Sequence, residues 1–518
     1  MRIGIYNRYW TTRGGAERYA GVMAEILSQE HEVELLGCDD LELGTLEKHL
    51  GLDLSRTRFR LLVPGVERDL APVTAEYDLF INCTFLSKLP SEAERSVYVV
   101  LFPQRVLPKG LVRAVRGVTD LFEIRQSPVV PIEGFYGTDR RGSRWSRSYA
   151  RLRIEPSAFS DRQARVRLGS SKMPWSLEEA LLEIEAPGLD WTVEADELVF
   201  ECKAPSLGPF TVAFTCKTFK PTDWGSTDDR DLGVCLSISR IFLPWVIAQG
   251  LARRLSGRMD GYDPEIPARY DRLVSISEFT RSWVEQRWGL SSEVLAPPVD
   301  TSTFTPPAPG DKERVILSVG RFFQGAHNKK HLEMLEVFRR MVDRGEIPEG
   351  WEYHLAGNLH RNRKAHLDYF ARLERLAEGY PVRLLVDLPF DRLVEEYRRA
   401  SIFWHAAGWG EDERRRPEKL EHFGITTCEA MSAGCIPVVI AKAGQLEIVE
   451  HGESGFFFTD THELEQTTAR LIRGYGEPWT HDLMRRASAS VQRFGRAEFE
   501  ARLWEILGDL GDGTNGPR

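Results

Sequence analysis

The stretch EHFGITTCEAMSAGCIPVV, residues 421–439, joins a short helix to a buried strand. Its pattern predicts a helix over residues 425–432 that ends at Gly434, followed by an apolar strand, IPVVIA, over residues 436–441. Such helix–strand alternation is typical of a parallel sheet whose helices connect successive strands. The rest of the chain can be read outward from this segment.

The same alternation occurs twice. In the N-terminal part, strands are predicted at residues 2–7, 32–36, 77–82 and 96–102, and a turn at Gly14 and Gly15 precedes the first helix. In the C-terminal part, strands are predicted at residues 314–319, 352–356, 382–386, 401–406 and 436–441. The sequence therefore predicts two doubly wound, Rossmann-like α/β domains, with a ligand crevice between them where strand ends meet.

Residues 126–243 follow a different pattern, with short alternating runs separated by turn residues. This pattern predicts an antiparallel β-sandwich inserted into the first α/β domain. Its tryptophans could pack a core or form a sugar platform, and core packing is the favoured reading; they are Trp145, Trp175, Trp191 and Trp224.

The proline-rich residues 296–310 are predicted to be a stiff linker. The first domain is thus predicted at residues 1–125 and 244–300, on either side of the insert at 126–243. The second domain is predicted at residues 301–480. Helices at 481–510 could return to the first domain, and residues 511–518 form a loose tail.

Composition excludes several classes of protein. A net charge of −9, from 68 Lys and Arg against 77 Asp and Glu, argues against a nucleic-acid binder. The sequence has no apolar run long enough for a signal peptide or a membrane span. Its seven cysteines form no CxxC pair, which favours a reducing cytoplasm over a disulfide framework or a zinc site.

Two basic segments, residues 109–117 and 244–258, could seat the first domain on an anionic membrane or could be ordinary packed helices; both readings stay open. Asp229, Arg230 and Asp231 fit a DxD metal motif, but a solvated turn is the favoured reading. We expect no metal and no cofactor.

A candidate anion site surrounds the opening stretch. Gly424 lies at a predicted helix N-terminus, where unpaired N–H groups and the helix dipole favour an anion. Glu421 and Glu429 flank it as acceptors for hydroxyl groups. Arg321, after strand 314–319, and Lys329, before the next helix, could neutralise a diphosphate. This combination predicts a site for a nucleotide diphosphate sugar.

These residues also carry a family resemblance. Glu421 and Glu429, in an E-x7-E arrangement, resemble the signature of the retaining GT-B glycosyltransferases of family 4 (group 1). VGRF…KKHLEMLEVF, YDRLVSISEFT, VLAPPVDTSTFTP, GESGFFF and RGGAERYAGVMAEIL resemble its other landmarks in order. The match covers nearly everything except the insert. The residues around HNKK and EHFGITT are most similar to those of α-1,2-mannosyltransferases of lipid-linked oligosaccharide and bacterial envelope glycan assembly.

The resemblance implies a role for each position. Glu429 would hold the ribose and Glu421 the hydroxyls of the donor sugar. Arg321 and Lys329, favoured over Lys330, would bind the diphosphate. Backbone groups would complete the donor site at Phe423, Gly424, Ile425 and, from the acceptor-side first domain, Gly15. Glu421, Arg321 and Lys329 would support catalysis by positioning and electrostatic stabilisation during a front-face displacement, without a metal.

Three features depart from the family or stay open. Leu101, within YVVLFP, stands where a histidine is expected, and Asn82 is the candidate to supply its contact. Ala443, Gly444 and Gln445 replace the usual paired glycines. His422 could be an acid or base, although a hydrogen-bonded loop histidine is favoured, and the charged loop 410–421 could cover the site or be solvated.

The sequence thus predicts a cytoplasmic retaining hexosyltransferase, with mannose the favoured hexose and a glycan or lipid-linked acceptor, in envelope polysaccharide or lipopolysaccharide biosynthesis. The insert would bind carbohydrate or a partner. The alternative is a catalytically weakened GT-B scaffold that acts as a glycan-binding protein, which Leu101 favours and the intact Arg321, Lys329, Glu421 and Glu429 oppose. A phosphorylase or nucleotide-sugar epimerase on the same fold is a third reading.

Overall fold

The computed structural model describes residues 1–12, 14–39, 41–62, 67–105, 129–136, 143–169, 173–202, 209–224, 230–237, 265–325, 328–359, 361 and 364–508. The chain divides into two compact units. Unit 1 holds residues 1–98 and 104–272, and unit 2 holds residues 99–103 and 273–518. The basic segments at 109–117 and 244–258, and the tail at 511–518, lie outside the described residues.

Unit 1 contains a parallel sheet with the neighbouring strand order β5-β4-β1-β2-β3. Its elements are β1 (Arg2–Tyr6), α1 (Gly15–Leu27), β2 (Glu32–Gly37), α2 (Leu43–Leu50), β3 (Thr57–Leu61), α3 (Ala71–Thr74), β4 (Leu79–Asn82) and β5 (Arg95–Val100). The apolar face of α1 is buried, and the Gly14 N–H donates to Glu17 Oε2 at 2.7 Å where this helix begins. These strands and helices confirm the predicted α/β architecture.

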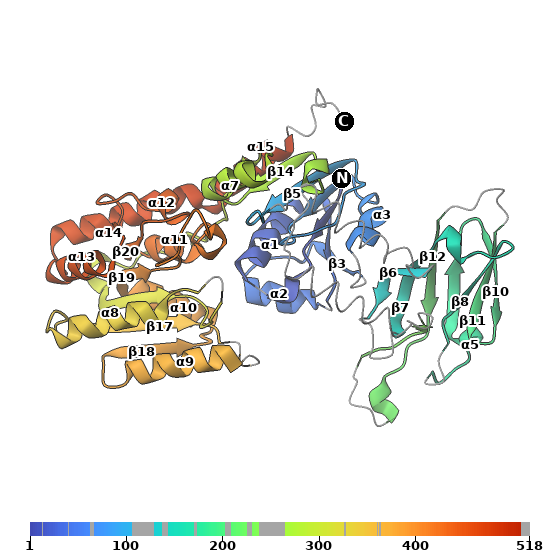
Figure 1. The fold of residues 1–518 in the computed structure, drawn as a ribbon, viewed down its shortest axis with the longest axis horizontal. Helices are drawn as coiled ribbons and strands as arrows, with labels where there is room; N and C mark the ends of the chain where they lie inside the picture. The colour runs from blue at the N-terminus through green and yellow to red at the C-terminus, as the bar shows by residue number, and fades with distance from the viewer. Residues whose placement is uncertain are drawn as a thin grey trace. The chain divides into compact units, whose positions relative to one another are not determined.

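The insert within unit 1 consists of two antiparallel sheets, with orders β10-β11-β8 and β13-β7-β12-β9, and β6 also pairs with β7 (Figure 1). The strands are β6 (Val129–Phe135), β7 (Ser143–Ile154), β8 (Gln163–Arg167), β9 (Leu181–Glu185), β10 (Leu189–Glu194), β11 (Glu197–Cys202), β12 (Phe210–Cys216) and β13 (Cys235–Ser237), with the short α5 (Leu177–Ala180) before β9. Leu152 and Phe214 of one sheet share a buried core with Phe200 of the other. The predicted β-sandwich is confirmed.

The tryptophans of the insert differ in environment. Trp145 is buried and meets the Phe219 ring edge-on at 5.6 Å, and Trp175 meets the same ring at 6.0 Å. Trp191 on β10 is 43% exposed. The side chain of Trp224 lies outside the described residues. The core reading is therefore confirmed for Trp145 and Trp175, whereas Trp191 faces solvent.

A buried charge network links the insert to the first sheet. Arg60 of β3 forms ion pairs with Glu76 at 2.9 Å and with Glu133 of β6 at 2.6 Å. Arg151 of β7 also pairs with Glu76, at 2.6 Å. Burial by itself would raise the pKa of Glu76, but hydrogen bonds from Arg60 and Arg151 outweigh this effect and lower it. The Glu76 carboxylate is therefore ionised and paired.

Unit 2 contains a six-stranded parallel sheet with the order β18-β17-β16-β19-β20-β21. Its strands are β16 (Glu313–Val319), β17 (Glu352–Gly357), β18 (Val382–Val386), β19 (Ala400–His405), β20 (Ile436–Ile440) and β21 (Phe456–Phe458). Its helices are α7 (Glu278–Trp288), α8 (His331–Asp343), α9 (Lys364–Ala377), α10 (Phe390–Arg399), α11 (Ile425–Ser432), α12 (Gln445–Ile448), α13 (Thr461–Arg473), α14 (Pro478–Ser490) and α15 (Arg496–Gly508). Two short strands, β14 (Arg272–Ser275) and β15 (Glu293–Val294), pair in parallel.

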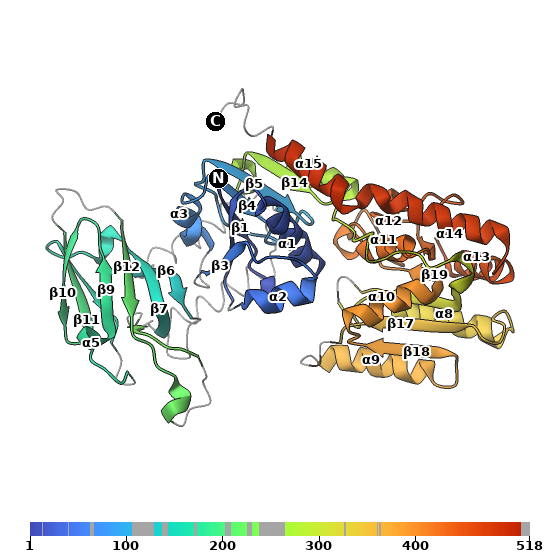
Figure 2. The same ribbon diagram turned by 180° about the vertical axis from the view of Figure 1, so that it is seen from behind.

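The side chains of β16 alternate between two buried clusters. Ile316 packs in a cluster with residues of α8, α9 and α13, whereas Leu317 packs with residues of α10 and α11. Helices therefore cover both faces of the sheet (Figure 2). This arrangement confirms the doubly wound prediction for the C-terminal part.

The proline-rich residues 296–310, predicted as a linker, belong to unit 2 and are anchored in it by Phe304. Phe304 is fully buried, and its ring lies 5.2 Å from that of Tyr397 on α10. Ser432 Oγ at the end of α11 donates to the Phe304 carbonyl at 2.7 Å. Phe304 thus anchors a segment whose proline content alone predicts a linker.

Candidate functional site

The candidate site lies where the strand order of unit 2 reverses. From β16 the chain moves outward to β17 and β18, and then returns to β19 on the other side of β16. Lys329 precedes α8, which follows β16, and Glu421 precedes α11, which follows β19. Ligands of open α/β sheets bind at such a reversal, outside the carboxyl ends of the strands.

Lys329 and Glu421 meet there in an ion pair between Lys329 Nζ and Glu421 Oε2. Each side chain is 19% exposed. A Cβ atom on Gly320, directly after β16, would lie 2.5 Å from Lys329 Cγ, so a glycine is needed for the lysine to cross the strand end. The structure therefore brings together two of the predicted residues, which are 92 positions apart.

His405, the last residue of β19, completes this pair. Its Nε2 lies 3.0 Å from Glu421 Oε2. Burial by itself would raise the pKa of Glu421, but the Lys329 ammonium and the His405 hydrogen bond hold it well below its usual range. Burial lowers the pKa of His405, as does the Lys329 charge, against the opposing effect of Glu421. A neutral imidazole therefore donates to an ionised carboxylate.

A second histidine, His331, lies buried at the start of α8. Burial, together with the charge of Lys329, lowers its pKa to about 3. Both of its ring nitrogens lack a hydrogen-bond partner within the described residues. At neutral pH, His331 and His405 are thus uncharged, and the charges of Lys329 and Glu421 balance.

The N-terminus of α11 has the form predicted for an anion cradle. The helix spans Ile425–Ser432, no side chain caps its first turn, and its N-cap is Gly424 at φ 124°. A Cβ atom on Gly424 would lie 2.6 Å from Gln445 Nε2. The first-turn N–H groups of such a helix point outward to a ligand, and the helix dipole favours a negative one.

Glu429 lies within α11 and is held by Tyr397 of α10. The Tyr397 hydroxyl donates to Glu429 Oε2 at 2.9 Å. Burial raises the pKa of Tyr397 well above its usual value, and the Glu429 charge raises it further, so the phenol stays a donor. The carboxylate is therefore oriented before any ligand arrives.

The remaining predicted residues make other contacts within their own units. Arg321 is exposed, and its guanidinium lies over the Phe323 ring at 5.2 Å; within the described residues it forms no ion pair with Glu421 or Glu429. Phe423 packs its ring against Phe494 at 5.2 Å. Gly15 is the first residue of α1 in unit 1.

Asn82 is not available to replace the missing histidine, so that prediction is wrong. It is fully buried, and its amide donates to Ser87 Oγ at 2.9 Å and to Tyr270 Oη at 3.0 Å. Its carbonyl oxygen accepts from the Thr84 N–H at 3.1 Å. Internal hydrogen bonds therefore use both ends of the side chain.

His422 is a packed loop residue. Its ring stacks on Phe102 at 4.0 Å with an interplanar angle of 10°, and Ser277 Oγ donates to its carbonyl at 2.6 Å. Phe279 stacks on the same imidazole at 6.3 Å. Leu101 lies next to this aromatic group, and its carbonyl accepts from Thr280 Oγ1 at 3.5 Å.

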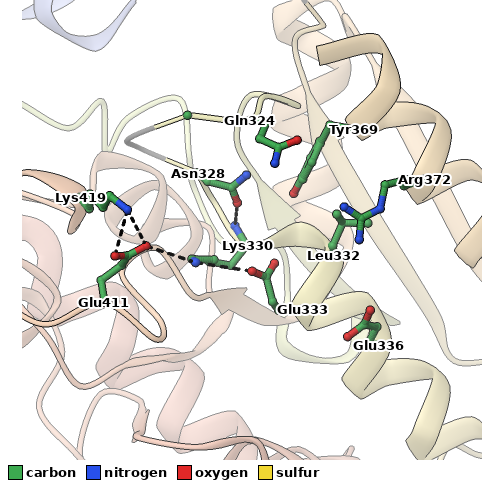
Figure 3. Close-up of a pocket in the computed structure, with 11 residues that line it drawn as sticks. Gln324, Asn328, Lys330, Leu332, Glu333, Glu336, Tyr369, Arg372, Glu411 and Lys419 are labelled. Carbon is green, nitrogen blue, oxygen red and sulfur yellow. Dashed lines mark hydrogen bonds and ion pairs between the residues drawn. The ribbon is translucent and has the colours of Figure 1, made fainter. Parts of the chain in front are cut away.

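The charged loop that leads to Glu421 packs against the start of α8. Glu411 lies 3.7 Å from Lys330 and 3.1 Å from Lys419 (Figure 3). These side chains, with Tyr369 and others, line a polar pocket of about 310 Å³. Lys330 thus faces this pocket, whereas Lys329 faces Glu421.

Sequence reasoning missed His405, Gln445 and Tyr397 as site residues. The position of His405 at the end of the predicted strand 401–406 is the signal that could have found it, because side chains at carboxyl ends of parallel strands line the ligand edge. The sequence marks Gln445 only as a replacement for a glycine.

Part of the chain is similar to a known protein family. Residues 301–487 match the family model "Glycosyl transferases group 1". This segment is therefore similar to group 1 glycosyltransferases. It contains β16 to β21 and both carboxylates of the candidate site.

Curated relatives match parts of the chain. The chain is 24% identical over 261 residues to GDP-Man:Man(3)GlcNAc(2)-PP-Dol alpha-1,2-mannosyltransferase of Dictyostelium discoideum, covering 48% of this chain and 49% of the relative. It is 34% identical over 124 residues to glycogen synthase of Desulfitobacterium hafniense, covering 21% of this chain and 24% of the relative. The chain thus spans about half the length of the first relative and about a quarter of the second.

Solved structures with a similar fold include HepE of Anabaena in complex with UDP, at 14% identity and a TM-score of 0.51, covering 98% of this chain and 100% of that one. A glycosyltransferase from Rickettsia africae has 11% identity and a TM-score of 0.55, covering 99% of both chains. Sucrose-phosphate synthase of Thermosynechococcus elongatus has 11% identity and a TM-score of 0.52, covering 99% of this chain and 100% of that one. These likenesses show that the chain has the GT-B fold.

The structure gives little information on the DxD motif or on the two basic segments. Asp229 lies outside the described residues, as do both basic segments. In the part of the chain that the structure describes, no three His, Cys, Asp or Glu side chains gather as a metal site, and no helix has the length and apolarity to cross a bilayer.

Proposed function

We propose that this protein is a retaining glycosyltransferase that transfers a hexose, with mannose the first candidate, from a nucleotide diphosphate sugar to a glycan or lipid-linked acceptor. The observation that carries the proposal is the Lys329–Glu421 pair beside the uncapped N-terminus of α11. Its place within a segment similar to group 1 glycosyltransferases supports the same assignment.

Each group has a distinct task in this proposal. The α11 N-terminus and Lys329 bind the diphosphate, since amide dipoles and an ammonium both favour oxyanions. Arg321 is exposed at the end of β16 and adds a second cation when the donor is bound. Glu421 and Glu429 accept hydrogen bonds from the sugar and ribose hydroxyls.

The chemistry follows from charge that develops on the leaving group. As the glycosidic bond to the diphosphate breaks, negative charge grows on its oxygens, and fixed positive groups stabilise it. The departing phosphate helps to take the proton from the acceptor hydroxyl, which attacks from the same face. No cofactor or metal is needed for this route, and we expect activity in the presence of EDTA.

The relatives guide the choice of donor and setting. One curated relative is named as a GDP-mannose-dependent α-1,2-mannosyltransferase, which supports mannose, whereas HepE was solved with UDP. We propose a role in envelope polysaccharide assembly, on the cytoplasmic side, with the insert as a carbohydrate-binding module that presents Trp191.

The test is release of nucleotide diphosphate by the purified full chain. GDP-mannose, UDP-glucose and UDP-galactose are offered with and without lipid-linked and free oligosaccharide acceptors, and products are identified by mass spectrometry. Acceptor-dependent release with an α-linked product supports the proposal, and Glu421→Gln should reduce it at least 100-fold. Binding of glycan without release from any donor would instead favour the non-catalytic glycan-binding protein that Leu101 suggests.

A further inference from the structure

The Glu421 carboxylate uses its two oxygens unequally. Lys329 Nζ and His405 Nε2 both approach Oε2. No described residue donates to Oε1, although the side chain keeps 19% of its surface exposed. One oxygen is therefore held within the protein and the other is open to a ligand.

His405 fixes this arrangement because of its own tautomer. The ring is 2% exposed and neutral, so only one nitrogen carries a proton. The nitrogen that faces the carboxylate must be the donor, since a bare lone pair there would repel Glu421. Nδ1 is then the acceptor, and Gln445 Nε2 lies 3.4 Å from it.

Gln445 is held where its amide can donate to His405 Nδ1. Its side chain is completely buried at the start of α12, and its amide oxygen has no partner in the described part of the chain. A hydrogen-bonding amide buried at the cost of an unsatisfied oxygen indicates that its nitrogen is needed where it lies.

The preceding turn is built tightly against Glu421. A Cβ atom on Gly444 would lie 2.4 Å from the Phe423 carbonyl oxygen, and the Gly444 N–H donates to the Glu421 carbonyl at 3.0 Å. Ala443 adopts a left-handed φ of 53°, which is costly for a residue with a side chain. The same turn therefore fixes both the backbone of Glu421 and the amide that orients His405.

We infer that His405 and Gln445 are positioning residues that lock Glu421 with Oε1 directed at the hydroxyls of the donor sugar. This inference rests on the proposed function, because it assumes that the ligand of Glu421 is a sugar. A freely rotating glutamate would lose side-chain entropy on binding, whereas a locked one has already lost it. We call the chain of contacts from Gln445 through His405 to Glu421 the relay. The relay should strengthen recognition of the sugar and leave recognition of the diphosphate unchanged.

The experiment compares a nucleotide sugar with its bare nucleotide diphosphate. Calorimetry on the full chain measures affinities for GDP-mannose against GDP, and for UDP-glucose and UDP-galactose against UDP. His405→Phe should weaken binding of the sugar nucleotide about tenfold, the equivalent of one hydrogen bond to a charged group. Binding of the bare diphosphate should change less than twofold.

Conservative variants separate positioning from packing. His405→Gln places an amide N–H near the lost Nε2 and should recover most of the affinity for the sugar nucleotide. Gln445→Met keeps the volume and removes the amide, so it should give a smaller loss of the same kind. His331→Phe makes the same exchange at a neighbouring buried histidine that does not contact Glu421 and should preserve the preference for the sugar. Equal losses for the sugar nucleotide and the bare diphosphate in His405→Phe would overturn the inference.

A second readout needs no donor. The groups nearest Glu421 among the described residues are Lys329 and His405, with His331 beyond the lysine. His405→Phe and His405→Gln both remove the titrating ring, but only the glutamine can keep a donor to Glu421. His405→Phe should therefore have its acid-unfolding midpoint at higher pH than His405→Gln, and this difference should vanish in a Glu421→Gln background. Equal midpoints in the two variants refute the relay. Wild-type chain that binds no nucleotide sugar while the difference appears refutes the proposed function instead.

Discussion

Replacement of Lys329 by methionine tests the charge pair at the centre of the site. Methionine keeps much of the aliphatic stem and removes the ammonium. Among the residues that the structure describes, His405 is then the one donor left to the Glu421 carboxylate. Breaking a buried pair by removing one partner costs about 3–5 kcal/mol. Because both side chains are 19% exposed, we expect the lower end, about 3 kcal/mol, in the stability of unit 2.

The loss should depend on pH in a defined direction. The folded-state pKa of Glu421 is depressed, so its ionisation contributes stability above the unfolded pKa of about 4.3. This contribution disappears as the pH falls through the lower folded pKa. The difference between wild type and Lys329→Met should therefore be full at pH 7 and shrink below about pH 4.

Urea titration read by hydrogen exchange in peptides from β16 and β19 reports on unit 2 alone. Lys330→Met is the matched control and should cost less than about 1 kcal/mol, because its partner Glu333 is 44% exposed and its other partner, Glu411, keeps Lys419 at 3.1 Å. The double variant Lys329→Met with Glu421→Gln removes the unpaired charge and should recover about 2 kcal/mol. Equal losses for the two lysines, or no recovery in the double variant, would refute this account of the site.

Three further outcomes follow from the structure. Arg60→Ala should lower the stability of unit 1 by about 3–5 kcal/mol, because it leaves buried carboxylates short of a partner; a urea midpoint close to wild type would contradict this. Gly424→Ala should cost about 2 kcal/mol or more, from φ 124° and crowding of Gln445, whereas Gly452→Ala, with open space around it, should cost about half as much in the same melt. Ala443→Gly should raise stability by about 0.5–1 kcal/mol by relieving its left-handed backbone, and a drop in thermal midpoint would show that the turn prefers alanine.

Much of the fold could be predicted because apolar runs and glycines determine it locally. The helix at 425–432 was predicted with its observed bounds, since Gly424 and Gly434 mark its two ends. Strands β3 and β6 were not predicted. β3 directs Arg60 into a buried network, and β6 contains Pro131 and Gly134, so charge and breaker residues hide both strands from a pattern of buried apolar residues.

The site was predicted less completely because it depends on contacts between distant residues. Lys329 and Glu421 could be chosen singly by their places before helices, but their pairing needs the neighbouring positions of β16 and β19 in the sheet. The polar roles of His405 and Gln445 depend on burial and on each other. Asn82 failed as a candidate for the same reason, since Tyr270, its partner, is 188 positions away.

The charge network between the insert and the first sheet is neutral on each side of the junction. Glu133 and Arg151 come from the sandwich, whereas Arg60 and Glu76 come from the host sheet, where they already pair with each other at 2.9 Å. Excision of residues 129–237 would thus take one charge of each sign out of this network and leave Arg60 paired with Glu76. An insert joined through such a network can be removed, in evolution or by protein engineering, without leaving an unpaired buried charge of this network in the host domain.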